Sequence, residues 1–218
     1  MTSSPTHTPA DARIRTVLFD CDGVLQAVAG GRGSRFHHVL SEDESDELED
    51  LIGEAQLPAQ YDLRDFHEVI TGLVTARGWD VDPEEIVRVH VDIELHEPGH
   101  EIRAELRDAG VHVGIATNQH RRRAEHMRTG LGYDDMVDVS FYSCDLGYAK
   151  PDPRFFGSIL EQLDQPGEQV LFIDDRLYHV ESARSVGLNA VHWHYEDGAD
   201  ALRRELAAYD LPVEAPAS

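Results

Sequence analysis

The sequence has few basic residues. Its 218 residues include 19 Lys and Arg against 42 Asp and Glu, which gives a formal charge of -23 at pH 7. A chain this negative repels the phosphate backbone of nucleic acids, so we expect no nucleic-acid partner. An anionic small-molecule ligand would need local help from a metal ion, a lysine or backbone N–H groups.

The sequence also has few cysteines and no long apolar run. Its two cysteines, Cys21 and Cys144, argue against a disulfide framework or a zinc site and predict free thiols in a reducing cytoplasm. No stretch approaches the roughly 20 apolar residues that cross a bilayer, so we expect no membrane contact. Residues 1–13 lack the apolar centre of a secretory signal and predict a loose tail. These features favour a cytoplasmic protein.

The segment from Thr16 to Leu25, T-V-L-F-D-C-D-G-V-L, places two carboxylates after a short apolar run. Val17 to Phe19 favour a buried strand, and the glycine that follows Asp22 permits a sharp turn. Two carboxylates this close resist full ionisation unless a cation lies between them or one of them holds a proton. The pair therefore predicts a metal site, a shared proton or both, although Asp and Gly are also common in an ordinary strand-ending turn.

Residues 98–218 alternate between helical periodicity and short apolar runs. Strands separated by single helices predict βαβ units, and hence a parallel sheet covered by helices on both faces. The fold class that we expect is α/β, with a Rossmann-like sheet. The predicted strands cover 111–117, 139–143, 170–173 and 190–193, and the predicted helices cover 99–109, 120–129, 154–163, 178–186 and 199–208.

Residues 26–97 contain helical patterns and no convincing strand. Helices are predicted over 63–77 and 82–96, the second with Asp82 as its cap and Pro83 in its first turn. The block therefore predicts an all-helical insertion between the two parts of the α/β core, which are residues 1–25 and 98–218.

Polar side chains of distinct kinds follow the predicted core strands. Ligands of parallel sheets bind outside the carboxyl ends of the strands, so we expect these side chains to converge on one spot. Taken singly, Thr, Asn and Asp often cap helices and a lysine usually lies on the surface. Their joint occurrence in this order favours a catalytic site, made of Asp20, Asp22, Thr117, Asn118, Lys150, Asp174 and Asp175.

These residue types suit phosphoryl transfer. Asp20 can attack the phosphorus atom, and Asp22 can protonate the leaving oxygen and later take a proton from water. The Thr117 hydroxyl and nearby backbone N–H groups can hold phosphate oxygens, while Lys150 balances their charge. The acidic pair after the strand at 170–173 completes an oxygen cage suited to Mg²⁺. The residues expected to contact substrate are Thr117, Asn118 and Lys150.

Four motifs, F-D-C-D-G-V-L, A-T-N, Y-A-K-P-D-P-R-F-F and F-I-D-D-R-L-Y-H-V-E-S-A-R-S-V-G-L, closely resemble those of the haloacid dehalogenase-like hydrolase superfamily. The match spans most of the chain. The resemblance implies a Mg²⁺-dependent phosphomonoesterase with Asp20 as nucleophile, Asp22 as acid/base, and Thr117 and Lys150 on the phosphate. It also implies that residues 26–97 are the helical cap domain of the phosphatase branch.

Two details refine what the resemblance implies. Dehalogenases of this superfamily lack the second aspartate of the first motif, so Asp22 favours phosphatase chemistry over carbon–halogen cleavage. The double-aspartate variant favours Asp175 over Asp174 as the direct metal ligand, and both stay candidates beside Asp20 and Asp22. His179 stands where this variant often has Asn or Asp. Because a proton on His179 would disfavour a cation, we expect a pH-sensitive metal affinity.

The substrate depends on the cap, where the sequence is least informative. A small phosphorylated metabolite is expected, such as a sugar phosphate or a nucleotide, bound by a monomer or a homodimer. Gln26, Arg35, His37 and Arg64 are candidates for substrate selection, whereas Arg121 fits a solvated helix face better than a substrate contact. Two alternatives remain open: a phosphotransferase or phosphomutase that passes the phosphoryl group to a hydroxyl, and a non-catalytic phosphate-binding regulatory module.

Overall fold

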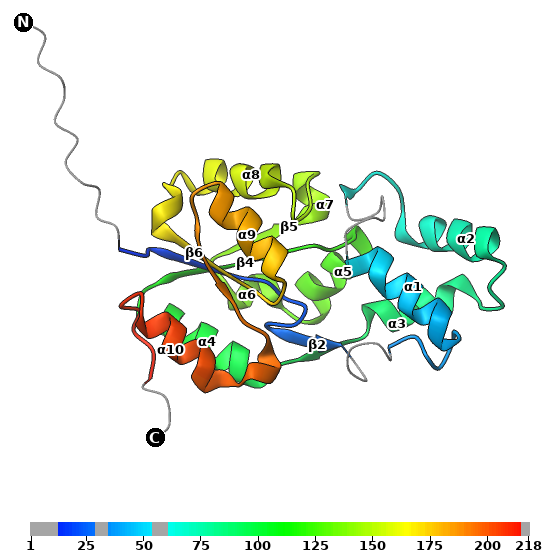
Figure 1. Cartoon of the computed structure of the whole chain (residues 1–218), viewed down its shortest axis with the longest axis horizontal. Coiled ribbons are helices and arrows are strands. Elements are labelled where there is room, and N and C mark those ends of the chain that lie inside the picture. Colours follow the sequence, from blue (N-terminus) through cyan, green and yellow to red (C-terminus); the bar gives the residue numbers. More distant parts are fainter. Residues whose placement is uncertain (1–12, 29–34, 54–60, 215–218) are drawn as a thin grey trace, which may run out of the picture.

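The computed structural model describes residues 13–28, 35–53 and 61–214. At its centre lies a five-stranded sheet in the order β5-β4-β1-β6-β7, in which every neighbouring pair is parallel (Figure 1). This arrangement confirms the predicted α/β fold with a Rossmann-like sheet. The strands are β1 Thr16–Phe19, β4 His112–Thr117, β5 Val139–Tyr142, β6 Val170–Asp174 and β7 Asn189–His192.

Helices cover both faces of the sheet (Figure 1). Successive side chains of a strand point to opposite faces, so Val17 and Phe19 belong to one apolar cluster and Leu18 to another. Both clusters are buried, which explains why β1 is apolar throughout. The first cluster includes side chains of α4 Glu97–Asp108 and α10 Ala199–Ala207, and the second includes side chains of α8 Pro153–Leu163 and α9 Leu177–Ser185.

The register of the sheet brings the polar strand ends together. Phe19 at the end of β1 pairs with Ile115 of β4 on one side and with Ile173 of β6 on the other. Asp20 directly follows Phe19, and Asp174 directly follows Ile173. The Asp20 N–H donates to the carbonyl of Ile173 at 2.8 Å. The two acids therefore leave the sheet at the same edge.

The residues between β1 and α4 form a helical lobe beside the sheet (Figure 1). Its helices are α1 Glu42–Gly53, α2 Phe66–Arg77 and α3 Pro83–Val91. Asp65 and Asp82 cap the last two of these, because their carboxylates accept backbone N–H groups of the first turn. The lobe encloses an apolar cluster of its own, which includes Phe36, Leu48, Ile70, Trp79 and Ile86.

The expectation of no strand between residues 26 and 97 is wrong. Strands β2 Gln26–Val28 and β3 Ile93–Leu95 pair in antiparallel orientation, so the helix predicted over 82–96 ends at Val91. Strands of three residues are too short to show an alternating pattern, and I-E-L also fits the helical spacing before it. The pair joins the two segments through which the chain enters and leaves the lobe.

Short helical elements account for the other differences from the prediction. The helix predicted over 120–129 is divided into α5 Arg121–Glu125 and a π-helical turn, η2 His126–Gly130. Segments of three or four residues carry too little periodicity to be recognised in a sequence. The elements missed for this reason are α6 Tyr133–Met136, α7 Ser143–Leu146 and the 3₁₀ turns η3 Gly167–Gln169 and η4 Tyr195–Asp197.

Two expectations concern the tail and the membrane. The loose tail predicted over 1–13 falls, apart from Arg13, outside the described residues. Among the helices of the part that the structure describes, none combines the length and apolar character needed to cross a membrane.

Gly114→Ala is expected to destabilise the protein, because the sheet leaves no room for a side chain there. A Cβ atom on Gly114 would lie 2.6 Å from Cγ1 of Val139 and 2.8 Å from Cδ2 of Leu18. Overpacking of this kind costs about 1–3 kcal/mol, which urea unfolding measures as a lower midpoint.

Gly157→Ala in α8 is the matched control. Nothing lies within 4 Å of a Cβ atom at this position, and alanine favours a helix over glycine by about 1 kcal/mol. We therefore expect this variant to be at least as stable as the wild type. A Gly114→Ala variant that unfolds at the wild-type midpoint would contradict the packing described here.

Candidate active site

A cavity of about 470 Å³ lies between the carboxyl edge of the sheet and the helical lobe. Six of the seven predicted site residues line it, and the seventh, Asp174, is buried in contact with Lys150. The structure therefore brings the predicted constellation together. The six lining residues are Asp20, Asp22, Thr117, Asn118, Lys150 and Asp175.

Lys150 is fully buried and joins two acids, so it is not a surface lysine. Its Nζ lies 2.8 Å from Oδ1 of Asp20 and 2.6 Å from Oδ2 of Asp174. Burial lowers the pKa of Lys150, but the two carboxylates outweigh burial and raise the pKa above its ordinary value. Asn118 fixes the lysine backbone, because its Nδ2 donates to the Lys150 carbonyl at 2.9 Å and its Oδ1 accepts the Lys150 N–H at 2.8 Å.

The carboxylate of Asp20 is buried at the end of β1. Its Oδ1 accepts the backbone N–H of Cys21 at 2.7 Å as well as the Lys150 ammonium. Burial raises the pKa of Asp20 to about 7, against the attraction of Lys150 and with added repulsion from Asp174. A carboxyl group held near its neutral form gains from any further positive charge in the cavity.

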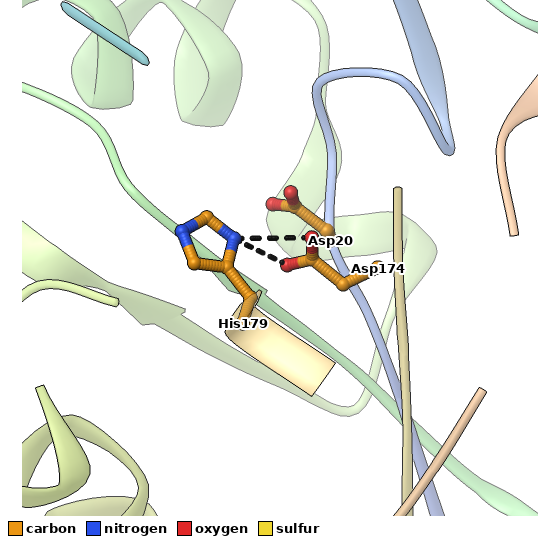
Figure 2. Close-up of side chains that lie close together, drawn as sticks. All are labelled: Asp20, Asp174 and His179. Atoms are coloured by element: carbon orange, nitrogen blue, oxygen red, sulfur yellow. Dashed lines mark hydrogen bonds and ion pairs between the residues drawn. The ribbon is translucent and has the colours of Figure 1, made fainter. Parts of the chain in front are cut away.

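Asp174 is held by donors from three residues. Its carboxylate accepts the Lys150 ammonium, the backbone N–H of Arg176 at 2.8 Å and Nδ1 of His179 at 3.0 Å (Figure 2). Burial raises the pKa of Asp174, but Lys150 and His179 outweigh burial and hold it below its usual range. Burial lowers the pKa of His179, which keeps its imidazole neutral at pH 7.

The predicted metal ligands separate into two groups. Ligand atoms of Asp20, Asp174 and His179 lie within 4.8 Å of one another, close enough to hold a metal ion. However, the Lys150 ammonium already contacts the carboxylates of Asp20 and Asp174. Asp175 lines the cavity instead. Of the acidic pair, Asp175 is therefore the residue beside the space that a substrate and its cation would share.

Gly23 sets how closely the first motif approaches Asp175. Its backbone has φ of 82°, and a Cβ atom on Gly23 would lie 2.6 Å from Cγ of Asp175. Glycine is thus required here both for the left-handed turn and for the close contact. The sequence pattern indicated the turn, whereas the contact with Asp175 is visible only in the fold.

Both carboxylate oxygens of Asp22 accept hydrogen bonds. Arg123 donates to Oδ2 at 2.6 Å and to Oδ1 at 2.8 Å, Gln26 donates to Oδ1 at 2.9 Å, and Gln119 donates to Oδ2 at 2.9 Å. Burial raises the pKa of Asp22, but Arg123 outweighs burial and holds the pKa well below its usual range. In this arrangement Asp22 is a carboxylate.

Arg123 contacts the predicted site, although the sequence did not indicate it as a site residue. It is 1% exposed, and its Nη1 also donates to Oε1 of Gln119 at 2.7 Å. The solvated face predicted for Arg121 does not extend to Arg123. Three consecutive helical positions span about 200° around the axis, so one of the three arginines can turn inward while the others stay exposed.

The residues considered for substrate selection lie in different places relative to the cavity. Arg35 lines the cavity. Gln26 is fully buried, His37 is exposed outside the cavity lining, and Arg64 lies on the lobe surface with its side chain 57% exposed. Arg121 donates to the exposed carboxylate of Asp62, to Oδ1 at 2.8 Å and to Oδ2 at 2.7 Å. It does not line the cavity, in agreement with the predicted solvated face.

A stack of rings joins the lobe to the core. Nδ1 of His90 in α3 lies 3.0 Å from Nε2 of His120, and the ring of Phe66 in α2 stacks on His120 with centroids 3.7 Å apart. Nδ1 of His120 accepts the backbone N–H of Arg123 at 3.3 Å, so its Nε2 carries the proton and donates to His90. Burial lowers the pKa of both histidines, and both are neutral in this stack.

His90→Phe is expected to reduce the loss of stability in acid. Because burial holds the folded-state pKa values of His90 and His120 below 6.5, the unfolded chain binds more protons below that pH. The free energy of unfolding therefore falls as the pH falls. One histidine contributes up to about 1.4 kcal/mol per pH unit to this slope, and the variant loses that share.

Urea unfolding between about pH 5 and 7 measures the slope. The exposed His38 provides the control, since His38→Phe is expected to keep the wild-type slope. A His90→Phe variant with an unchanged slope would show that this pair does not contribute to acid sensitivity.

Comparisons with known proteins show what this chain is similar to. A family model described as haloacid dehalogenase-like hydrolase matches residues 14–187. Pyrophosphatase PpaX of Bacillus cereus (strain G9842) is 27% identical over 188 residues, which cover 83% of this chain and 84% of that protein. Sesquiterpene phosphatase astK of Aspergillus oryzae is 34% identical over 89 residues, which cover 40% of this chain and 45% of that protein.

A solved structure supports the fold. The magnesium complex of the HAD family enzyme bt-2542 from Bacteroides thetaiotaomicron superimposes with a TM-score of 0.71 and 18% sequence identity, over 88% of this chain and 98% of that chain. The family match covers most of the chain and all four motifs that carry the resemblance. The chain is a hydrolase and belongs to the haloacid dehalogenase-like hydrolases.

Proposed function

We propose that the protein is a Mg²⁺-dependent phosphatase that hydrolyses a small phosphorylated metabolite, such as a sugar phosphate or a nucleotide, through an aspartyl-phosphate intermediate. The observation that carries this proposal is the buried carboxylate of Asp20, 2.8 Å from the Lys150 ammonium and on the wall of a cavity. This distance supports the proposal because a carboxylate that could attack phosphorus lies beside a cation that could bind the phosphate. The printed names of PpaX and astK, a pyrophosphatase and a phosphatase, support it further.

In the first step an oxygen of Asp20 attacks the phosphorus atom in line with the leaving oxygen. The bond from Asp20 to phosphorus forms while the bond from phosphorus to the leaving oxygen breaks, and the leaving oxygen takes the electron pair. Lys150 neutralises charge on the phosphate oxygens, and the Thr117 hydroxyl on the cavity wall donates to one of them. Both groups lie in place before substrate binds.

Asp22 moves the protons of both steps. As a carboxylate it has the form that takes a proton from the water that attacks the aspartyl phosphate. In this second step the bond from water oxygen to phosphorus forms, the bond from Asp20 to phosphorus breaks, and inorganic phosphate leaves. The proton that Asp22 takes from water in this step balances the proton that it gives to the leaving oxygen in the first step. Arg123 orients the carboxylate and is a positioning residue.

The acids of the cavity fit Mg²⁺. The pKa of Asp20, raised to about 7, marks a site that is short of positive charge, and carboxylate oxygens are the ligands that Mg²⁺ prefers. Asp20 and Asp175 line the cavity and would hold the ion. Asp174 is engaged with Lys150, and both carboxylate oxygens of Asp22 already accept hydrogen bonds, two of them from Arg123. When bound, Mg²⁺ supplies positive charge to the transferring phosphate.

The helical lobe, residues 26–97, would act as a cap domain on the core formed by residues 1–25 and 98–218. The lobe has an apolar cluster of its own, and its residues Arg35, Ile52 and His90 line the cavity. A cap in this place excludes bulk water from the aspartyl phosphate during transfer.

The free, buried thiols of Cys21 and Cys144 support a cytoplasmic location. The cavity within one chain suits a monomer or a homodimer.

Asp20→Asn is expected to abolish phosphate release, because the amide cannot form the aspartyl phosphate. The measurement is release of inorganic phosphate from a panel of phosphate compounds, with Mg²⁺ and with a chelator. We expect a fall of at least about 10³-fold, and loss of activity in chelator for the wild type. Asp80→Asn, on an exposed residue of the lobe, is the control. Equal turnover by Asp20→Asn and wild type would disprove the nucleophile.

Asp175→Asn and Asp174→Asn are expected to fail in different ways. Loss of the Asp175 carboxylate removes a metal ligand, so calorimetry is expected to show a drop in Mg²⁺ affinity of at least about tenfold. Loss of the Asp174 carboxylate leaves Lys150 with one acid in place of two, so urea unfolding is expected to show a loss of about 3–5 kcal/mol. The reverse pattern would make Asp174 the metal ligand.

A further inference from the structure

The cavity wall carries positive charge in addition to that of Lys150 and Arg123. Arg35, from the segment between β2 and α1, and Arg176, from the turn between β6 and α9, both line it. We propose that these two arginines bind a second anionic group, on the leaving-group side of the substrate. The substrate class is then a phosphate compound whose leaving group is itself an anion, such as a diphosphate. This inference rests on the proposed phosphatase function.

Arg35 is partly buried and contains an unsatisfied donor. Its guanidinium lies over the ring of Phe36, 4.9 Å from the centroid. Its Nε is buried and has no hydrogen-bond partner among the residues that the structure describes. A buried donor without a partner is destabilising. Because Arg35 lines the cavity, an anion bound there would lie close to the positive charge of this guanidinium.

The charges around Arg35 leave it short of negative partners. Burial lowers the pKa of Arg35 to about 10, and repulsion from Arg123 and Arg176 acts in the same direction. Asp22 and Glu49 oppose this shift without cancelling it. Like charges repel strongly where water is scarce, so an anion placed among these guanidinium groups would be stabilised by more than one of them.

Arg35 differs in this respect from the other cavity cations. Arg123 forms two hydrogen bonds with Asp22. Lys150 contacts both Asp20 and Asp174. Their charges are therefore already matched within the protein. Arg176 donates to the hydroxyl of Tyr178 at 2.8 Å. The charges of Asp20 and Asp174 also act on Arg176, but no hydrogen bond from its guanidinium to a carboxylate occurs among the described residues.

Three acidic residues of α1, Asp46, Glu49 and Asp50, share the cavity wall with Arg35. Asp46 and Asp50 are exposed, so water and salt screen their charges, whereas Glu49 is half-buried and its charge acts on Arg35. Arg35 is less exposed than Asp46 and Asp50, and its field inside the cavity is screened less than theirs. The acidic residues of α1 therefore weaken the attraction of the cavity for an anion that approaches from solution. An anion that has entered the cavity is still attracted by Arg35.

The residues proposed to hold the transferring phosphate give the site its direction. Lys150 and Thr117, on the wall of the same cavity, are the groups proposed to bind that phosphate. A second anionic group held by Arg35 therefore belongs to the departing fragment of the substrate. A neutral alcohol would gain nothing from this arginine, whereas a departing phosphate or carboxylate would.

Calorimetry with two non-hydrolysable probes tests the site without turnover. Methylenediphosphonate carries the second anionic group and methylphosphonate lacks it. In Mg²⁺ we expect the wild type to bind the first at least about tenfold more tightly, as a charge-assisted hydrogen bond of about 1.5–3 kcal/mol predicts. Arg35→Gln is expected to lose this preference. Equal affinities in the wild type, or an unchanged preference in Arg35→Gln, would overturn the proposal.

Two further variants separate charge from folding. Arg64→Gln changes an arginine on the lobe surface, outside the cavity, and is expected to keep the full preference. Arg35→Lys keeps the charge, and we expect it to retain part of the preference and to fold if Arg35→Gln does not. Complete loss of the preference in Arg64→Gln as well would overturn the assignment to Arg35.

Turnover distinguishes this inference from the proposed function. We expect kcat/KM for pyrophosphate and for phosphoglycolate, whose leaving groups are anionic, to exceed that for ethyl phosphate by at least about tenfold. A preference for pyrophosphate alone identifies a diphosphate substrate, and a shared preference identifies any anionic leaving group. Equal rates on all three overturn the inference but leave the phosphatase intact. Probe binding without turnover of any ester refutes the phosphatase but leaves the anion site intact.

Discussion

The buried contact of Lys150 with Asp20 and Asp174 is the constraint on which the site depends. Moving charges out of water costs several kcal/mol per ion, so none of the three is stable there without the others. The contact ties the ends of β1 and β6 to the loop that follows α7. The apolar clusters on both faces of the sheet hold these strands in register, and the register in turn fixes the distances among the three charges.

The same principle applies at Asp22, where Arg123 is the buried cation. The chain has 19 basic residues against 42 acidic ones, so cationic side chains are scarce. Lys150 and Arg123 are matched to acids of the protein, while Arg35 and Arg176 face the space between core and lobe. The division separates the groups that hold the catalytic carboxylates from those available to a ligand.

The sequence was sufficient to predict the parallel sheet and the convergence of its polar strand ends, because apolar runs and strand-end acids are local patterns. Asp20 and Lys150 could be placed for this reason. Arg123 could not, because its role depends on which side of a short helix turns inward. Strands β2 and β3 were not predicted, because a strand of three residues is too short to show an alternating pattern of apolar and polar residues. The resemblance favoured Asp175 over Asp174 as the metal ligand, whereas the contact of Lys150 with Asp174 is visible only in the fold.

The antiparallel pairing of β2 with β3 limits how the lobe can move. These strands are the two crossings of the chain between sheet and lobe, and the N–H of His96 extends the pairing by donating to the Leu25 carbonyl at 2.9 Å. Two separate, unpaired linkers would leave each crossing free to turn by itself. In a hydrogen-bonded ribbon the two crossings can bend only together, so the pairing restricts the orientations that the lobe can take over the sheet.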